Sequence, residues 1–226
     1  GALLACNHIS YVDAVLLVVT IARPIRFIIS REIYNTSILK GLFKIGRVIP
    51  IDRKDNPKEI IRAFNIAKDA LKNGELVCIF PEGQLTRTGN LLKFNAGIEH
   101  ILKGLDCPVI PVNIDRIWGS IFSHEGGKYL KKWPKIIPYP VTVSFGQQMP
   151  TTSTAFAIRS RVMELGADAF QYRLVDKVTL PEAFWREARK HPSKFCIADS
   201  SGKKLNYGTT LISAVAISRK INGKLF

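Results

Sequence analysis

Short apolar runs alternate along this chain with longer segments in which apolar residues recur at helical spacing. The runs have the length and the β-branched composition of buried strands, and polar turns or glycines bound them. We expect strands at residues 2–6, 25–30, 47–52, 75–80, 108–114 and 141–146. Strands that alternate with helices are typical of an α/β fold, so we predict a mostly parallel central sheet flanked by helices.

The expected helices lie between these strands. The clearest one covers residues 56–74, where apolar residues share one face, Pro57 lies in the first turn and Gly74 follows the last turn. We expect three further helices and a short one after Asn95; the three cover residues 11–22, 37–46 and 154–172.

The character of the sequence changes near Lys177. The remainder is predicted to form a connector, a hairpin over residues 194–208 and a helix, which is too little to bury a core of its own. We therefore predict one domain over residues 1–175, and a linker with the truncated start of a second domain over 176–226. The abrupt beginning at Gly1 is expected to be a cut inside a longer protein or a remnant of cloning.

Composition narrows the class of partner. The chain has 226 residues, 46% of them hydrophobic, and a net charge of +15 that favours polyanions or anionic surfaces. Nucleic acid, anionic lipid, an acidic carrier protein and phosphorylated small molecules all remain open. The longest apolar run, residues 14–22, is too short to span a bilayer. The four cysteines lack metal-ligand spacing and are expected to be reduced and buried.

Two polar residues near the start could form a catalytic pair. In the segment NHISYVD, His8 follows the first predicted strand and Asp13 falls in the first turn of the next helix. The aspartate could accept a hydrogen bond from one imidazole nitrogen and leave the other as a base toward a substrate hydroxyl. In the structural alternative, Ser10 caps the helix and Asp13 only interacts with its positive end.

Two further polar segments follow predicted strands. Glu82 and Gly83, in the segment FPEG, are expected at the same sheet edge as His8 if both strands are parallel. Arg53 ends the segment GRVIPIDR, and arginine suits bidentate binding of phosphate. The alternatives are a surface turn for the first segment and a weak surface ion pair for the second.

Together and in this order, four blocks resemble the glycerolipid acyltransferase superfamily, which includes the lysophosphatidic acid acyltransferases. The blocks are HISYVD at 8–13, GRVIPIDR at 46–53, FPEG at 80–83 and VIPV at 109–112. The resemblance covers about residues 1–175 and implies a glycerol-3-phosphate acyltransferase-like fold.

The resemblance also implies a role for each matching residue. His8 would be the general base that deprotonates the acceptor hydroxyl, and Asp13 would orient and support its imidazole. Arg53 would hold the acceptor phosphate, with Glu82 and Gly83 positioning the acceptor. No acyl-enzyme, metal or cofactor is implied for this domain.

The loop after FPEG points to a narrower branch. Many relatives continue this block with T-R-S, whereas here it continues with QLT, so the nearest cation is Arg87, which we assign to acceptor binding. This loop and residues 118–146 resemble the acyltransferase half of bifunctional bacterial 2-acylglycerophosphoethanolamine acyltransferase/acyl-carrier-protein synthetases. The tail resembles the opening of their AMP-forming ligase domain, for which alone ATP and Mg are implied.

Residues 118–140 interleave aromatic and basic side chains. This mixture suits contact with anionic lipid, and an acidic acyl carrier protein could bind the same cations. The alternative is a basic, partly packed loop. The residues assigned to a membrane or carrier interface are Trp118, Lys128, Lys131, Lys132 and Trp133. We expect a peripheral protein at the cytoplasmic face of the inner membrane.

The expected function is transfer of a fatty acyl group from acyl carrier protein or coenzyme A to the free hydroxyl of a lysophospholipid. The resemblance favours 2-acylglycerophosphoethanolamine as acceptor, with 1-acylglycerol-3-phosphate as the alternative. A non-catalytic lipid-binding or nucleic-acid-binding module would leave the four blocks unexplained. Since no recognition helix or aromatic RNA-binding strand is visible, no nucleic-acid partner is expected.

Overall fold

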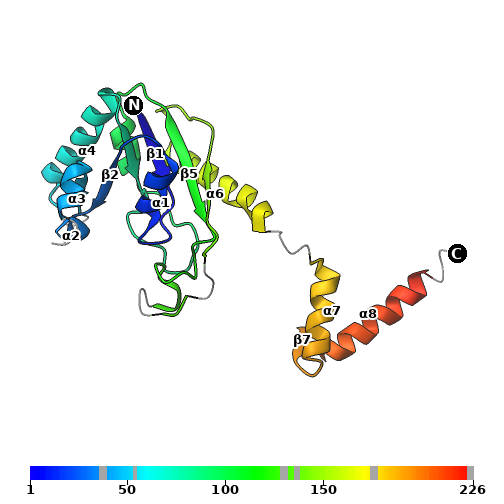
Figure 1. The fold of residues 1–226 in the computed structure, drawn as a ribbon. Helices are drawn as coiled ribbons and strands as arrows, with labels where there is room; N and C mark the ends of the chain where they lie inside the picture. The colour runs from blue at the N-terminus through cyan, green and yellow to red at the C-terminus, as the bar shows by residue number, and fades with distance from the viewer. Residues whose placement is uncertain (36–39, 53–54, 128–131, 135–137, 174–177, 223–226) are drawn as a thin grey trace. The chain divides into compact units, whose positions relative to one another are not determined.

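The computed structural model describes residues 1–35, 40–52, 55–127, 132–134, 138–173 and 178–222. The chain divides into two compact units, Gly1–Arg173 and Leu174–Phe226, which Figure 1 shows in colours from blue to red. Each unit is considered by itself. No helix within the described ranges is both long enough and apolar enough to cross a membrane.

The first unit is built on a six-stranded sheet with the order β3-β2-β4-β1-β5-β6. All neighbouring strands are parallel except β6, which is antiparallel to β5. This confirms the predicted mostly parallel sheet, and every predicted strand forms. The strands are β1 (Ala2–Cys6), β2 (Ile25–Ser30), β3 (Ile49–Ile51), β4 (Leu76–Ile79), β5 (Val109–Asp115) and β6 (Thr142–Phe145).

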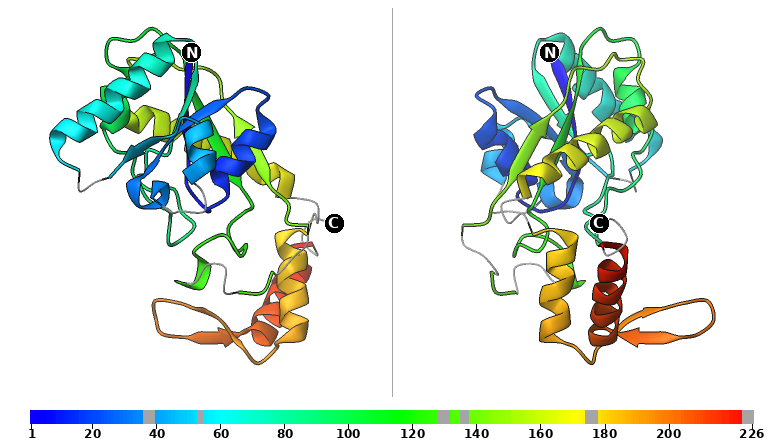
Figure 2. Two further views of the ribbon diagram at one scale, coloured as in Figure 1. Left: turned by 60° about the vertical axis from the view of Figure 1, so that its left-hand side comes forward. Right: turned by 90° about the vertical axis from the view of Figure 1, so that its right-hand side faces the viewer.

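Helices cover both faces of this sheet, as the two hydrophobic cores and the views in Figure 2 show. One core contains buried residues of α4, α5 and α6, and the other contains Leu17 of α1. The helices of the first unit are α1 (Asp13–Thr20), α2 (Arg31–Tyr34), α3 (Lys40–Ile45), α4 (Pro57–Lys72), α5 (Gly97–Leu102) and α6 (Ala155–Ala169), with short 3-10 turns η2 (Glu125–Gly127) and η3 (Phe170–Arg173).

Local signals explain where the long helices begin. The Asn56 side chain accepts a hydrogen bond from the Glu59 N–H at the start of α4, and Pro57 occupies the first turn. Thr154 caps α6 in the same way through the Ala157 N–H. The sequence did not predict α2, which Ser30 caps through the Glu32 N–H. Of the helix predicted over 37–46, the structure describes only the part from Lys40.

The strand order brings the turns after β1, β4 and β5 to one edge of the sheet. Ala5 of β1 pairs with Ile79 of β4, and Cys6 pairs with Val112 of β5. Because these strands are parallel, the residues that follow each of them emerge side by side. His8 and Glu82 therefore lie at the same edge of the sheet, as predicted.

The second unit contains α7 (Leu180–Lys190), the hairpin β7 (Phe195–Ala198) and β8 (Lys204–Asn206), and α8 (Tyr207–Asn222). The hairpin and the helix after it were predicted. The prediction of a plain connector before them was wrong, because that stretch forms α7. Thr179 caps this helix through the Glu182 N–H, and Phe184 packs on Tyr207 with ring centroids 5.7 Å apart.

Candidate active site

Asn7 joins the end of β1 to β5 through its side chain. Its Nδ2 donates to the Ile114 carbonyl at 2.9 Å, and the Ile114 N–H donates to its Oδ1 at 2.7 Å. Both residues are buried. The amide thus continues the pairing of the two strands beyond their last backbone bonds, and it fixes the point from which His8 departs.

Replacing Asn7 with alanine should therefore destabilise the first unit. The change leaves the buried N–H and carbonyl of Ile114 without these partners, and we expect a loss of about 2–4 kcal/mol in the free energy of unfolding. Urea denaturation measures it. The exposed Asn65 on α4 provides the control, since Asn65→Ala should change stability by less than about 0.5 kcal/mol. A loss below about 1 kcal/mol for Asn7→Ala would contradict this role.

Asp13 is fully buried and receives four hydrogen bonds from the segment before it. Its Oδ2 accepts from Nδ1 of His8 at 2.9 Å, from the Ile9 N–H at 2.7 Å and from the Ser10 N–H at 2.9 Å. The Ser10 hydroxyl donates to Oδ1 at 2.6 Å. An ionised carboxylate only accepts hydrogen bonds, so this arrangement suits the tautomer with the proton on Nδ1, in which Nε2 is the acceptor.

Ser10 does not cap α1, in contrast to the structural alternative. The N-cap position is Val12, and no side chain caps the helix there. The Ser10 hydroxyl donates to the carboxylate of Asp13 at 2.6 Å and accepts from the Val12 N–H at 3.3 Å, just before the helix. The turn is therefore organised around a carboxylate that faces both the backbone and the imidazole.

The imidazole ring of His8 is also held by an aromatic neighbour. It stacks on Phe80 with ring centroids 4.3 Å apart and an interplanar angle of 22°. The ring centroid of Phe80 in turn lies 6.5 Å from that of Phe27 of β2. The side chain of His8 keeps 20% of its surface exposed. One face of the ring is thus fixed while part of it still reaches solvent.

Glu82 binds the backbone of the segment that carries His8. It is only 2% exposed. Its Oε1 accepts from the His8 N–H and its Oε2 from the Leu92 N–H, both at 2.8 Å. Burial raises the pKa of the Glu82 carboxyl, and the two N–H groups act in the opposite direction. That Glu82 helps to position the acceptor stays a prediction; in the structure, both of its oxygens accept from backbone N–H groups.

The loop after Glu82 also holds the other side of the His8 residue. The Thr86 N–H donates to the His8 carbonyl at 3.0 Å. Thr86 is buried, and its hydroxyl donates to the Asn90 carbonyl at 2.8 Å. Glu82 and Thr86, four positions apart, therefore bind the N–H and the carbonyl of His8 respectively. The sequence offered no signal for Thr86, whereas Phe80 could have been suspected from its place in the FPEG block.

The other predicted binding residues lie around this loop or outside the described part of the chain. Gly83 is exposed and has φ 65°, a conformation that glycine adopts without strain, and Arg87 is exposed directly after Thr86. Arg53 lies outside the described residues. Two positions later in the sequence, Asp55 accepts a bidentate ion pair from Arg31 at 3.0 and 2.8 Å, which lowers the pKa of the Asp55 carboxyl.

The predicted interface residues differ in orientation. Trp118 packs inward: it borders a hydrophobic core, and a Cβ at Gly89 would lie 2.8 Å from its ring. Lys132 also turns inward and donates to the Ser123 hydroxyl at 3.2 Å and to the Glu125 carbonyl at 3.3 Å. Trp133 is 92% exposed. Lys128 and Lys131 lie outside the described residues. Of the three that the structure describes, Trp133 alone therefore presents its side chain to solvent as the interface prediction requires.

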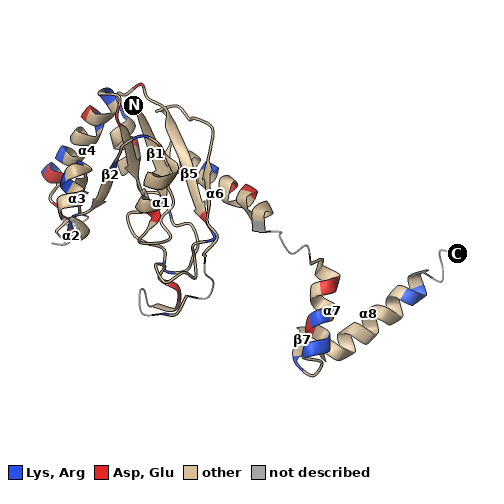
Figure 3. Cartoon of the chain, viewed as in Figure 1, with Lys and Arg blue, Asp and Glu red and all other residues tan. Residues whose placement is uncertain are grey.

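The exposed face of α1 lies next to this site and is apolar. Val15, Val18 and Val19 are each more than half exposed, and Tyr11, in the turn before the helix, is also exposed. After Asp13 the helix contains no charged residue, as Figure 3 shows. A cluster of exposed apolar side chains beside a polar site indicates contact with an apolar partner.

No cysteine is assigned a chemical role in the site, although the Cys6 thiol donates to Oδ1 of Asn7 at 3.7 Å. Cys6, Cys78 and Cys107 are buried, as predicted, whereas Cys196 in the second unit is partly exposed. Burial raises the pKa of the Cys6 and Cys78 thiols well above the ordinary range. Among the described residues, no group of three or more His, Cys, Asp or Glu side chains is arranged to hold a metal ion.

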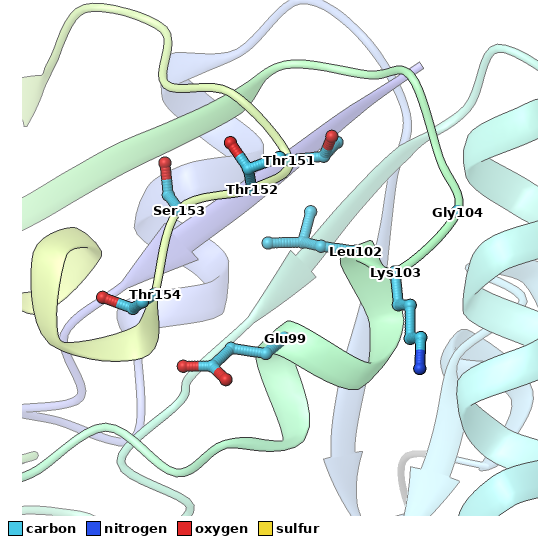
Figure 4. A pocket seen from close by; sticks show the side chains of 8 residues that line it. All are labelled: Glu99, Leu102, Lys103, Gly104, Thr151, Thr152, Ser153 and Thr154. Carbon is cyan, nitrogen blue, oxygen red and sulfur yellow. The ribbon is translucent and has the colours of Figure 1, made fainter.

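A hollow of about 320 Å³ lies elsewhere, at the opposite edge of the sheet (Figure 4). It adjoins the bridge between Met149 and Val109, the first residue of β5. The Glu99 carboxylate accepts from the Ala155 N–H at 2.7 Å and so already satisfies part of the N-terminus of α6. The lining residues are Glu99, Leu102, Lys103, Gly104, Thr151, Thr152, Ser153 and Thr154. The hollow is thus separate from the His8 site.

The sequence of this chain is similar to those of known acyltransferases. A family model described as Acyltransferase matches residues 1–115. The chain is 28% identical over 151 residues to a 1-acyl-sn-glycerol-3-phosphate acyltransferase of Cocos nucifera, which covers 66% of this chain and 46% of the relative. It is 28% identical over 152 residues to a probable enzyme of the same name from Mycoplasma genitalium, covering 64% and 55%. The chain thus spans about half the length of the curated relatives it matches.

A solved structure supports the fold. The crystal structure of the 1-acyl-sn-glycerophosphate acyltransferase from Thermotoga maritima aligns with a TM-score of 0.58 at 21% identity, covering 77% of this chain and 67% of that one. At this level of identity the likeness concerns the fold alone. It confirms the predicted type of α/β fold.

Proposed function

The chain belongs to the Acyltransferase family, and from this premise we propose that it moves a fatty acyl group from an acyl thioester to the free hydroxyl of a lysophospholipid. The observation that carries the proposal is the hydrogen bond of 2.9 Å between His8 Nδ1 and the buried carboxylate of Asp13. It orients an imidazole with a free acceptor nitrogen at the edge of the sheet where ligands of α/β folds bind.

The proposed reaction proceeds without an acyl-enzyme. Nε2 of His8 takes the proton of the acceptor hydroxyl, whose oxygen forms a bond to the thioester carbonyl carbon. The carbon–sulfur bond then breaks, and the thiolate leaves with the proton from the imidazolium. Asp13 stabilises the positive charge that His8 carries in between. The reaction needs no metal or cofactor.

The neighbouring residues divide into two proposed roles. Glu82, Thr86 and Phe80 hold His8 in place, through its N–H, its carbonyl and its ring. Arg53 and Arg87 would bind the phosphate of the acceptor. The exposed backbone at Gly83 would allow the acceptor to approach closely.

Two acceptor headgroups are supported by different observations. The names of the relatives support 1-acylglycerol-3-phosphate. The resemblance of residues 80–94 and 118–146 to the bifunctional branch supports 2-acylglycerophosphoethanolamine. Because the tail resembles the opening of a ligase, we propose that residues 176–226 are a linker and the start of an AMP-binding ligase domain, which would use ATP and Mg.

Assays of the full-length protein with each acceptor, and with acyl carrier protein and coenzyme A thioesters as donors, test the proposal. Product phospholipid is measured by mass spectrometry. Preference for one headgroup decides between the two acceptors. If none of the four combinations of donor and acceptor gave product, the proposed function would be refuted.

The apolar face of α1 is proposed to rest on the lipid surface that supplies the acceptor. The net charge of +15 favours an anionic membrane. Val19→Asp places a charge on this face at an exposed position, so it should weaken binding to phosphatidylglycerol vesicles about tenfold without unfolding the chain. Vesicle sedimentation measures the binding. Ile61→Asp, at an exposed apolar position of α4, is the control and should bind normally. Equal losses in both variants would contradict a specific role of α1.

A further inference from the structure

A single peptide unit lies between a cation and an anion behind the site. The guanidinium of Arg159 on α6 donates from Nη2 to the Leu91 carbonyl at 2.9 Å. The N–H of that same peptide unit, which belongs to Leu92, donates to Oε2 of Glu82 at 2.8 Å. The other oxygen of Glu82 accepts from the His8 N–H at 2.8 Å. A continuous path of hydrogen bonds therefore runs from α6 to the backbone of His8.

The chemistry of each group suits this path. Nε of Arg159 donates to the Leu92 carbonyl at 2.7 Å as well, so the planar fork binds two successive carbonyls. A lysine could not reproduce this geometry. A cation at the carbonyl polarises the peptide and makes its N–H a stronger donor. That N–H serves the buried carboxylate of Glu82, which needs strong donors because it is removed from water.

We infer that Arg159 is a positioning residue for His8, acting through the Leu91–Leu92 peptide and Glu82. The inference rests on the proposed function in assigning the base to His8. Arg159 lies on α6, beyond the residues 1–115 that the family model matches. The site of this chain is thus completed by a helix outside the matched segment.

Amide hydrogen exchange tests the path independently of turnover. In Arg159→Met, the amides of His8 and Leu92 should exchange about tenfold faster than in the wild type, because the local structure that protects them opens more easily. Arg159→Lys should show a similar gain, and it is the second variant if the methionine change prevents folding. Arg161 pairs with Glu164 at 2.6 Å on the same helix, so Arg161→Met is the matched control and should leave both amides unchanged. Unchanged exchange at His8 and Leu92 in a folded Arg159 variant would overturn the inference.

Steady-state kinetics tests the consequence for the reaction. Arg159→Met should lower kcat about tenfold and change KM by less than about twofold, since the residue does not touch substrate. In a Glu82→Gln background, Arg159→Met should lower kcat by less than about twofold, because the path of hydrogen bonds through Glu82 is already broken. Full additivity of the two losses, or an unchanged kcat in Arg159→Met, would overturn the inference while leaving the proposed function intact. Absence of transfer in the wild type would instead defeat the proposed function, and the exchange experiment would still decide the inference.

Discussion

His8→Ala is expected to lower kcat/KM for acyl transfer by about 10²–10⁴-fold, the usual contribution of a general base. The loss should not come from unfolding. Glu82 and Thr86 bind the N–H and the carbonyl of residue 8, which alanine retains, and the imidazole is partly exposed. Kinetic assays, with circular dichroism to verify folding, measure the effect.

The control for this experiment is His191→Ala. His191 lies in the second unit, after α7, and its loss should leave the rate unchanged. Wild-type turnover by His8→Ala would remove the proposed mechanism. If circular dichroism showed that the fraction of folded His8→Ala fell as far as its rate, only the claim that the imidazole is dispensable for folding would be removed.

Asp13→Asn is expected to lower kcat by about 10³–10⁴-fold, because an amide cannot stabilise a charged imidazolium. The fold should survive. With its oxygen at the position of Oδ2, asparagine still accepts from the donors on that side, and its NH₂ group can donate to the Ser10 hydroxyl if that group rotates. Asp13→Ala, in contrast, leaves buried donors unpaired and should also destabilise the protein by about 3 kcal/mol.

Comparison of the two variants separates catalysis from stability. The rate is measured at saturating substrate, and stability by urea denaturation. Asp106→Asn, at an exposed position before β5, is the control and should change neither quantity. If Asp13→Asn kept a rate within about tenfold of the wild type, the carboxylate would serve the turn and not the reaction.

The pattern of the sequence was sufficient for the sheet and for the closeness of His8 to Asp13. Apolar periodicity reports which residues face a core, and the predicted strands and long helices depend on little else. The distance from His8 to Asp13 is set by the turn after β1 and the start of α1, which together cover the six residues from His8 to Asp13. The predicted elements lack α7, although Thr179 and Glu182 at its start form a typical N-terminal capping sequence.

The sequence by itself determined the elements, the mostly parallel sheet and the residues able to act as base and orienter. Tertiary structure alone decided what holds them: Glu82 reaches His8 across 74 positions, and Asn7 reaches Ile114 across 107. It also decided that Trp118 and Lys132 turn inward, although their composition suited an exposed interface. The physical reason is that local patterns report the direction of a side chain only relative to its own helix or strand. The partner of a buried hydrogen-bonding group is chosen when distant segments close on one another, and only the folded chain shows which segments these are.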